Sequence, residues 1–368
     1  MIAPNSKRIL LITNTFHPDI NPRSFRSTEL VLGFVKAGHH VSVLCPRKEK
    51  IEGFFSSPMM DWIEMEGLTW WSAKVGFKSN IFSKALARAL NLFFAYPEIQ
   101  LAGSVFKALK NTQKNFDLVI SIAKPYSIHW GVAFFYSFNK KKKEKWVADC
   151  GDSFLVNQED NFITPFYFEW VEKWMYRHID FLSLPNNNYR KGFLDKIQSR
   201  IKIIPQGIDF NNFLVKQRIK RDDKLKLAYA GNFIPFKRDP REFIEFIASK
   251  DVDFEFCIFS KSQFISSLIP VHDSRFILKE LLPRKEVIHF LSEMDFLVNF
   301  ENSGSMASPS KLIDYTLTKR PILSVKYKSL DKEVVDQFFR GDYSSQLIIE
   351  NPDRFKIENV VNQFISLV

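Results

Sequence analysis

The sequence predicts an α/β protein built from two successive, doubly wound parallel sheets. Short, continuous apolar runs alternate with segments of helical spacing, which is the pattern of parallel strands buried on both faces. The alternation stops once, in the polar stretch 211–224, and then resumes on a similar plan. With 368 residues, 45% of them hydrophobic, the chain is long enough for two cores.

The first unit, predicted over residues 1–210, opens with an apolar strand, a polar loop at 14–27 and a helix that ends at Gly38. The later strands of this unit each follow a plausible helix. The predicted strands span residues 8–13, 40–45, 116–122, 145–150, 180–185 and 200–205.

The second unit is predicted over residues 225–350, after an interdomain linker at 211–224, and a last helix within 351–368 is expected to pack back on the first unit. Two units of this kind bind ligands beyond the carboxyl ends of their strands, which predicts a cleft between them. The predicted strands of the second unit span residues 225–231, 253–259, 275–278, 295–300 and 320–325.

The segment 77–110 is predicted to be helical, with apolar residues on one side and cations near the others. Two interpretations stay open for it. The apolar stripe is either core, or the face of a basic amphipathic helix that lies on an anionic membrane.

The charge balance favours an anionic partner. Lys and Arg number 52 against 41 Asp and Glu, a net charge of +11, which suits a nucleotide, a nucleic acid or an acidic membrane surface. The run Lys140 to Lys143 is expected to be a solvated loop. Nucleic-acid binding predicts aromatic and basic residues clustered on one platform, and the sequence shows no such cluster.

The three cysteines are isolated from one another and from any His cluster, which argues against a disulfide framework or a zinc site and fits a reducing cytosol. No window approaches the about 18 unbroken apolar residues of a membrane span, and the N-terminal apolar run is too short for a signal peptide. The expectation is a cytoplasmic protein, soluble or peripheral on the inner face of the membrane.

The segment AYAGNFIPFKRDP, residues 228–240, is the first candidate for chemistry. A buried strand ends at Gly231, where the missing side chain lets a backbone approach a ligand. Lys237 and Arg238 follow on the strand-end loop and can hold phosphate oxygens. The alternative is that Asp239 caps the next helix and the two cations are solvated.

The segment SPSKLIDY, residues 308–315, is the second candidate. Ser308 is a suitable N-cap, and the free N–H groups of a helix start attract anions. Lys311 places a positive charge where the helix dipole disfavours it, which suggests that an anion binds there. Asp314 can accept hydrogen bonds from ribose hydroxyls. The alternative is an ordinary capped helix.

Together these segments resemble the nucleotide-sugar-binding half of GT-B glycosyltransferases, specifically family 4. The resemblance rests on Gly231, on Lys237 six positions later, on an acid seven residues before Pro321, and on IKIIPQGIDFNNF at 201–213. It covers nearly the whole chain, and the subgroup it is most similar to occurs in bacterial surface-polysaccharide gene sets.

The resemblance implies two Rossmann-like domains facing a central cleft. It also implies transfer of a sugar, with retention, from a UDP- or GDP-sugar to a saccharide or lipid-linked saccharide acceptor. Neither an obligatory metal nor a tightly bound cofactor is expected, and no Asp-x-Asp pattern is positioned to hold a divalent ion.

On the donor side, the resemblance implies that Lys237 contacts the diphosphate, with Arg238 beside it, and that both assist catalysis. Asp314 matches the ribose-binding acid. Base recognition is expected from the backbone of the loop at 279–286. The predicted donor-binding residues are Gly231, Asn232, Lys261, Leu282, Ser308, Ser310, Lys311 and Asp314.

The sequence departs from the family pattern at three positions. Asn232 replaces a common Arg, Met306 replaces the first glutamate of the family's pair, and Lys319 replaces a usual Gly. The chain therefore lacks the acid that the resemblance associates with standard recognition of sugar hydroxyls.

In the first unit, NTFHPDINPRSFR at 14–26 occupies the place of the acceptor loop, and DCGDSF at 149–154 follows a strand. Asp149 and Asp152 are predicted to orient a hydroxyl or act as a base, while Asp19 and Asp152 are equally suited to turns or caps. His129 is predicted to be a helix residue near the cleft and not a catalyst. The predicted acceptor-binding residues are His17, Asp19, Arg23, Arg26 and Asp149.

Three other functions are kept as alternatives. A nucleotide-sugar epimerase of the same architecture would share the diphosphate site. A basic nucleic-acid-binding protein would explain the charge. A catalytically inactive scaffold is compatible with Asn232 and Met306.

Overall fold

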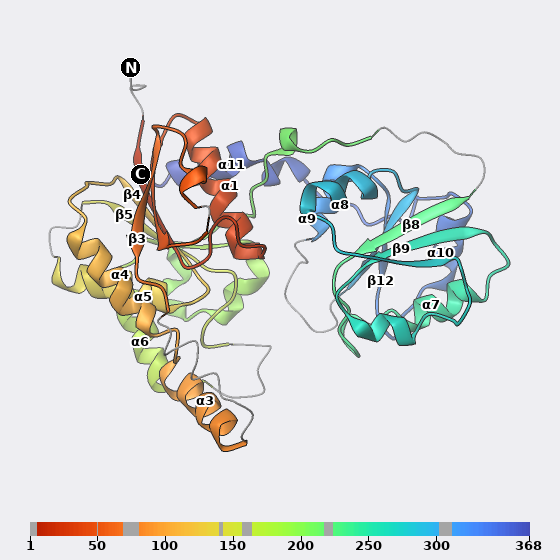
Figure 1. Ribbon diagram of the computed structural model, residues 1–368, viewed down its shortest axis with the longest axis horizontal. Coiled ribbons are helices and arrows are strands. Elements are labelled where there is room, and N and C mark those ends of the chain that lie inside the picture. Colours follow the sequence, from red (N-terminus) through yellow and green to blue (C-terminus); the bar gives the residue numbers. More distant parts are fainter. Residues whose placement is uncertain are drawn as a thin grey trace. The chain divides into compact units, whose positions relative to one another are not determined.

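The computed structural model describes residues 6–49, 51–68, 81–139, 143–156, 164–216, 224–301 and 311–368. The chain divides into two compact units, Met1–Ile208 with Arg354–Val368, and Asp209–Asp353. Each described unit is a parallel sheet with interleaved helices, so the predicted two-domain α/β fold is confirmed (Figure 1).

The first unit contains a parallel sheet in the order β3-β2-β1-β4-β5-β6-β7. Sequence patterns missed one of these strands, β3, because its side chains are mostly half-buried at the sheet edge and form no continuous apolar run. The strands are β1 (Arg8–Thr13), β2 (His40–Pro46), β3 (Met60–Met65), β4 (Leu118–Ile122), β5 (Lys145–Asp149), β6 (Phe181–Leu184) and β7 (Ile201–Ile203).

Side chains along these strands alternate between two apolar layers. Ile9 and Leu11 belong to one core and Leu10 and Ile12 to the other, as the period of two requires. Helices α1 (Pro22–Lys36) and α11 (Ile357–Ile365) contribute to the first core, and α4 (Gln100–Asn111), α5 (Ser127–Phe138) and α6 (Tyr167–Met175) to the second.

The last helix of the chain, α11, packs on α1. The rings of Phe34 and Phe364 lie 6.2 Å apart, and a β-bridge joins Ile208 to Lys356 at the start of this segment. The C-terminal residues therefore complete the core of the first unit.

The segment predicted as helical at 77–110 forms two helices, α3 (Ile81–Phe94) and α4, and residues 77–80 lie outside the described residues. The break falls at Ala95, whose φ is 49°, and at Pro97, which cannot continue a helix. The apolar stripe of α4, including Leu101 and Val105, is buried. The core interpretation therefore holds for α4. In α3, by contrast, Leu86, Phe93 and Phe94 are exposed.

The second unit contains a parallel sheet in the order β10-β9-β8-β11-β12. One face carries α7 (Arg241–Ala248) and α10 (Lys332–Phe339), and the other carries α8 (Arg284–Leu291) and α9 (Lys311–Thr318) (Figure 1). The strands are β8 (Leu225–Ala230), β9 (Phe254–Phe259), β10 (Phe276–Lys279), β11 (Phe296–Phe300) and β12 (Ile322–Val325).

The described part of the predicted linker lies against the second unit. The backbone N–H of Lys216 donates to Ser292 Oγ at 3.1 Å, and His289 Nδ1 lies 3.1 Å from the carbonyl oxygen of Leu214. Short 3₁₀ helices occur at Glu52–Phe54, Asn187–Gly192, Asp195–Arg200, Phe210–Asn212, Gln263–Ser267 and Pro352–Phe355.

Candidate functional site

The strand order of the second sheet reverses between β8 and β11. At such a switch point the loops that leave the carboxyl ends of the two strands diverge and make room for a ligand. The loop after β8 carries Gly231, Lys237 and Arg238, and α9, which follows β11, begins with Lys311. The topology therefore assigns these four predicted residues to the same edge of one sheet.

Asn232 organises the loop after β8. Its carbonyl oxygen accepts from Tyr229 Oη and from Arg238 Nη1, both at 3.0 Å. Its side-chain Oδ1 accepts from the backbone N–H of Lys261 at 3.2 Å. Asn232, one of the three departures from the pattern of the resembled family, thus joins the loop after β8 to the loop after β9.

Gly231 has a conformation that few other residues adopt. Its φ is +153°, and a Cβ added there would lie 2.9 Å from Tyr229 Oη. A side chain at this position would disturb both the tyrosine and the loop, so the glycine is required by the local geometry.

The cations of this loop differ in their surroundings. Lys237 is exposed and Arg238 half-buried. Asp239 is buried, and its carboxylate accepts from the backbone N–H groups of Phe236 at 3.2 Å and Arg241 at 3.1 Å. The contacts of Asp239 therefore agree with the alternative interpretation, in which this residue holds the start of the helix. Lys237 remains at the surface.

Lys311 is a partly buried cation at this edge. Its Nζ lies 4.3 Å from the centre of the Tyr229 ring and 3.5 Å from the carbonyl oxygen of Phe300. Burial, with the charge of Arg238 as a second cause, lowers the pKa of Lys311 well below its usual value. A bound anion would offset both causes.

Asp314 lies in the first turn of α9, where its carboxylate is bound by a residue that sequence patterns missed. Arg284 donates to Asp314 Oδ1 from Nε at 3.0 Å and from Nη2 at 2.5 Å. Burial raises the pKa of Asp314, and the guanidinium opposes that shift. No local sequence signal links these two residues, because 30 positions separate them.

The other predicted donor residues are distributed as follows. Leu282, in the loop before α8, is 40% exposed, and Lys261 is exposed after β9. Ser308, Ser310 and Met306 lie outside the described residues. The predicted roles of all the donor-side residues stay predictions.

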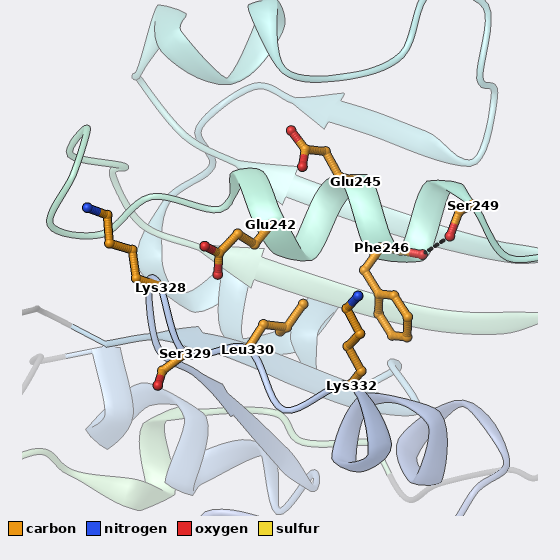
Figure 2. Close-up of a pocket in the computed structure, with 8 residues that line it drawn as sticks. All are labelled: Glu242, Glu245, Phe246, Ser249, Lys328, Ser329, Leu330 and Lys332. Carbon is orange, nitrogen blue, oxygen red and sulfur yellow. Dashed lines mark hydrogen bonds between the residues drawn. The ribbon is translucent and has the colours of Figure 1, made fainter.

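A separate pocket lies on the α7 and α10 face of the second unit, as Figure 2 shows. Two glutamates and two lysines line it, so its formal charges cancel, and none of the predicted donor residues is among its lining. This pocket is therefore not the predicted diphosphate site. Its lining residues are Glu242, Glu245, Phe246, Ser249, Lys328, Ser329, Leu330 and Lys332.

The first sheet has its own switch point, between β1 and β4. The loop after β1 carries His17, which is half-buried with its ring 5.1 Å from that of Phe54. Asp19 on the same loop pairs with Lys48 at 2.8 Å. The predicted acceptor loop is thus held by an aromatic contact and an ion pair.

Arg26 and Asp149, both predicted to bind the acceptor, form a buried ion pair with each other. Arg26 donates to the two carboxylate oxygens at 2.6 Å each, and the side chains are 3% and 1% exposed. Arg26 also donates to the carbonyl oxygen of Pro205 at 2.8 Å, and Ser183 Oγ donates to Asp149 at 2.6 Å. Acceptor contact with either residue would require the pair to open. In this structure the two side chains hold β5 and β6 to α1 and to the segment after β7.

Arg23 and Asp152 lie nearer the surface. A Cβ added to Gly151 would lie 1.4 Å from Arg23 Nη2, so the guanidinium occupies the space that the glycine leaves. Asp152 pairs with Lys124 at 3.5 Å, and both side chains remain more than 40% exposed. Lys124, from the loop after β4, was not among the predicted residues.

His129 is a buried residue of α5, which confirms its prediction as a helix residue. Its Nδ1 lies 2.8 Å from Ser121 Oγ and its Nε2 3.4 Å from Cys150 Sγ. Burial lowers the pKa of His129 to about 3. The imidazole is therefore neutral at physiological pH.

Within the described ranges, no group of three or more His, Cys, Asp or Glu side chains converges as a metal site would require. In the same ranges, no helix combines the length and apolar character needed to cross a bilayer.

Solved structures share the fold over nearly the whole chain. Sucrose-phosphate synthase from Thermosynechococcus elongatus matches with a TM-score of 0.64 at 11% identity. The lipopolysaccharide outer core galactosyltransferase WaaB matches with a TM-score of 0.59 at 10% identity. HepE from Anabaena, solved in complex with UDP and glucose, matches with a TM-score of 0.59 at 8% identity. Each match covers 98% of this chain and 98% of the other.

These likenesses confirm the fold expected from the resemblance in sequence, which is the two-domain α/β fold of GT-B glycosyltransferases. No protein-family model matches the chain, and no curated protein matches its sequence.

Proposed function

We propose that this protein is a glycosyltransferase of family 4 type that moves a sugar from a nucleoside-diphosphate-sugar to a saccharide or lipid-linked saccharide. The observation that carries the proposal is the group of cations at the β8 and β11 switch point. Lys311 Nζ lies 4.3 Å from the Tyr229 ring, and Arg238 and Tyr229 donate to the same carbonyl oxygen of Asn232. Burial, and after it the charge of Arg238, lowers the pKa of Lys311. Two cations close to each other favour an anion with spread charge, such as a diphosphate.

In this proposal Arg238 and Lys311 bind the diphosphate, and the exposed Lys237 adds a third cation as the leaving group gains charge. Asp314, oriented by Arg284, accepts hydrogen bonds from the ribose. UDP and GDP are the proposed nucleotides. UDP has the support of HepE, whose fold is similar and which was solved with UDP and glucose.

On the acceptor side, the proposal retains His17, Asp19, Arg23 and Asp152, which are at least partly accessible. Asp152 would orient the attacking hydroxyl, because its exposed pair with Lys124 can exchange for a ligand contact. Retention of configuration, independence of metal and a place in surface-polysaccharide synthesis at the inner face of the cytoplasmic membrane belong to the same proposal.

The test is thermal stability against UDP, GDP, ADP, CMP and dTDP, each with and without its common sugars. A ligand that binds only the native state raises its melting temperature by mass action. We expect one nucleoside diphosphate to raise it. The double variant Lys237→Ala, Arg238→Ala should lose the shift, and Lys332→Ala, in the pocket of Figure 2, should keep it.

Absence of a shift with every nucleotide, or an equal shift in the double variant, would contradict the donor site. Analysis of the products distinguishes a glycosyltransferase from a nucleotide-sugar epimerase. Transfer yields a glycosylated acceptor, whereas release of free sugar without transfer would favour the epimerase.

A further inference from the structure

Helix α3 has an apolar side that the protein does not bury. Leu86, Leu90, Phe93 and Phe94 recur at the spacing of one helix face. Leu86, Phe93 and Phe94 are 45%, 48% and 62% exposed. In a helix that packs on a core, this face would be the buried one, as it is in the neighbouring α4.

The start of α6 continues this apolar surface. The hydroxyl of Tyr167 donates to the carbonyl oxygen of Phe93, which brings the two helix ends together. Phe166 and Trp170 are 73% and 64% exposed, with their rings 5.4 Å apart. Figure 1 shows α3 projecting from the first unit with one end beside α6. We name Leu86, Phe93, Phe94, Phe166 and Trp170 the aromatic face.

The aromatic face is connected to the predicted acceptor side. The ring of Phe166 contacts that of Tyr167, which contacts Phe168, which contacts Phe154 at centroid distances of 5.9, 4.9 and 4.9 Å. Phe154 follows Asp152 by two residues. The face therefore adjoins the segment that carries Asp152 after β5.

We propose that the aromatic face docks on the surface of an anionic phospholipid bilayer. Leu and Phe on one side of a helix, with cations elsewhere on it, are features of helices that lie in a membrane interface, where Trp is also enriched. On α6, Glu169 beside Trp170 pairs with Lys173, so its charge is balanced. The sequence of α3 contains Lys84 and Arg88 and no acidic residue. The net charge of +11 adds long-range attraction to anionic lipid.

The charge and the projecting position of α3 favour a bilayer over a protein partner for the aromatic face. The cationic helix projects from the unit, which suits a flat surface more than a groove, and an isolated helix face of this type gains most of its binding from immersion of its aromatic rings. Docking does not require the proposed transfer reaction. It would, however, bring the Asp152 segment close to the place where a lipid-linked acceptor lies.

The experiment is cosedimentation of the full chain with two kinds of vesicle, one of phosphatidylcholine alone and one that also contains phosphatidylglycerol. We expect binding to the anionic vesicles, and weaker binding at high salt. The double variant Phe94→Ser, Trp170→Ser should lose about tenfold or more in partitioning, because two aromatic side chains no longer enter the interface. Arg88→Ala should lose up to about fivefold.

Phe138→Ser is the matched control. Phe138 is 71% exposed at the end of α5, just before β5 begins, whereas α6 starts after β5 ends. The two sites therefore lie at opposite ends of the strands of this sheet. Binding of this control should equal that of the wild type, and circular dichroism should show that all variants are folded. The proposal is overturned if the wild type binds neither vesicle, if the double variant binds as tightly as the wild type, or if Phe138→Ser loses as much. The assay contains no donor, so its failure leaves nucleotide binding untouched.

Discussion

The carboxyl edges of the two sheets differ in how they treat charge. In the first unit, cations and carboxylates at this edge pair with each other, as Arg26 with Asp149 at 2.6 Å and Lys48 with Asp19 at 2.8 Å. In the second unit, burial and then the nearby charge of Arg238 lower the pKa of Lys311, and the carboxylate of Asp314 is bound by Arg284. The first edge pairs cations with carboxylates, whereas the second places two cations near each other, which is where our proposal puts the anion.

The largest expected effect breaks the pairing in the first unit. Arg26→Met leaves Asp149 as a buried carboxylate without its cation, and removal of one partner of such a pair costs about 3–5 kcal/mol. Urea unfolding should show this loss of stability. A variant within 1 kcal/mol of the wild type would mean that the pair contributes little and that the contrast between the edges is weaker than its geometry suggests.

The next effect concerns the anion site of the second unit. Lys311→Met should weaken binding of the nucleoside diphosphate by about tenfold to a hundredfold, because a charge-assisted hydrogen bond contributes roughly 1.5–3 kcal/mol. Titration calorimetry measures the change. Lys332→Met, at the Figure 2 pocket, is the control that should bind as the wild type does.

Lys311 also predicts a dependence on pH. Because its pKa in the folded state is lowered, the unfolded chain holds this proton more tightly, so the free energy of unfolding rises with pH between the folded-state pKa and the ordinary value of 10.5. Nucleotide binding should weaken as pH rises through the folded-state pKa. Lys311→Met should lose both dependences, and a variant that keeps them would assign the titration to another group.

A smaller effect tests the self-contained interior of the first unit. The pKa of His129 is about 3 when folded and 6.5 when unfolded, so the unfolded chain takes up the proton first. Stability from this group is present above pH 6.5 and is lost as pH falls toward 3, by about 2 kcal/mol at pH 5. His129→Gln should flatten that part of the curve of unfolding free energy against pH. An unchanged slope would contradict the assignment.

The smallest expected effect concerns the ribose. Asp314→Asn should weaken nucleotide binding by roughly 1–2 kcal/mol through poorer acceptance of hydroxyl hydrogen bonds and a looser Arg284. Calorimetry should show the loss for a nucleoside diphosphate and little change for inorganic diphosphate. An equal loss for both ligands would place Asp314 at the phosphates and not at the ribose.

Much of the architecture was predictable because strand burial leaves a local pattern. The runs at 8–13 and 225–231 appear as β1 and β8 with nearly the same bounds, since both faces of a parallel strand must be apolar. The edge strand β3 was missed for the same reason, because its half-exposed residues do not follow that rule. The break between α3 and α4 was also missed, although Pro97 gave a local signal for it.

The sequence by itself determined the two α/β units, the glycine at a strand end and the cations that follow it, because each depends on residues close together in the chain. Only the tertiary structure decided which charged side chains form ion pairs with each other. The pairs Arg26 with Asp149 and Arg284 with Asp314 join residues 123 and 30 positions apart. Electrostatic and packing interactions act through space, so a sequence shows which charges a protein has, and the fold decides which of them meet.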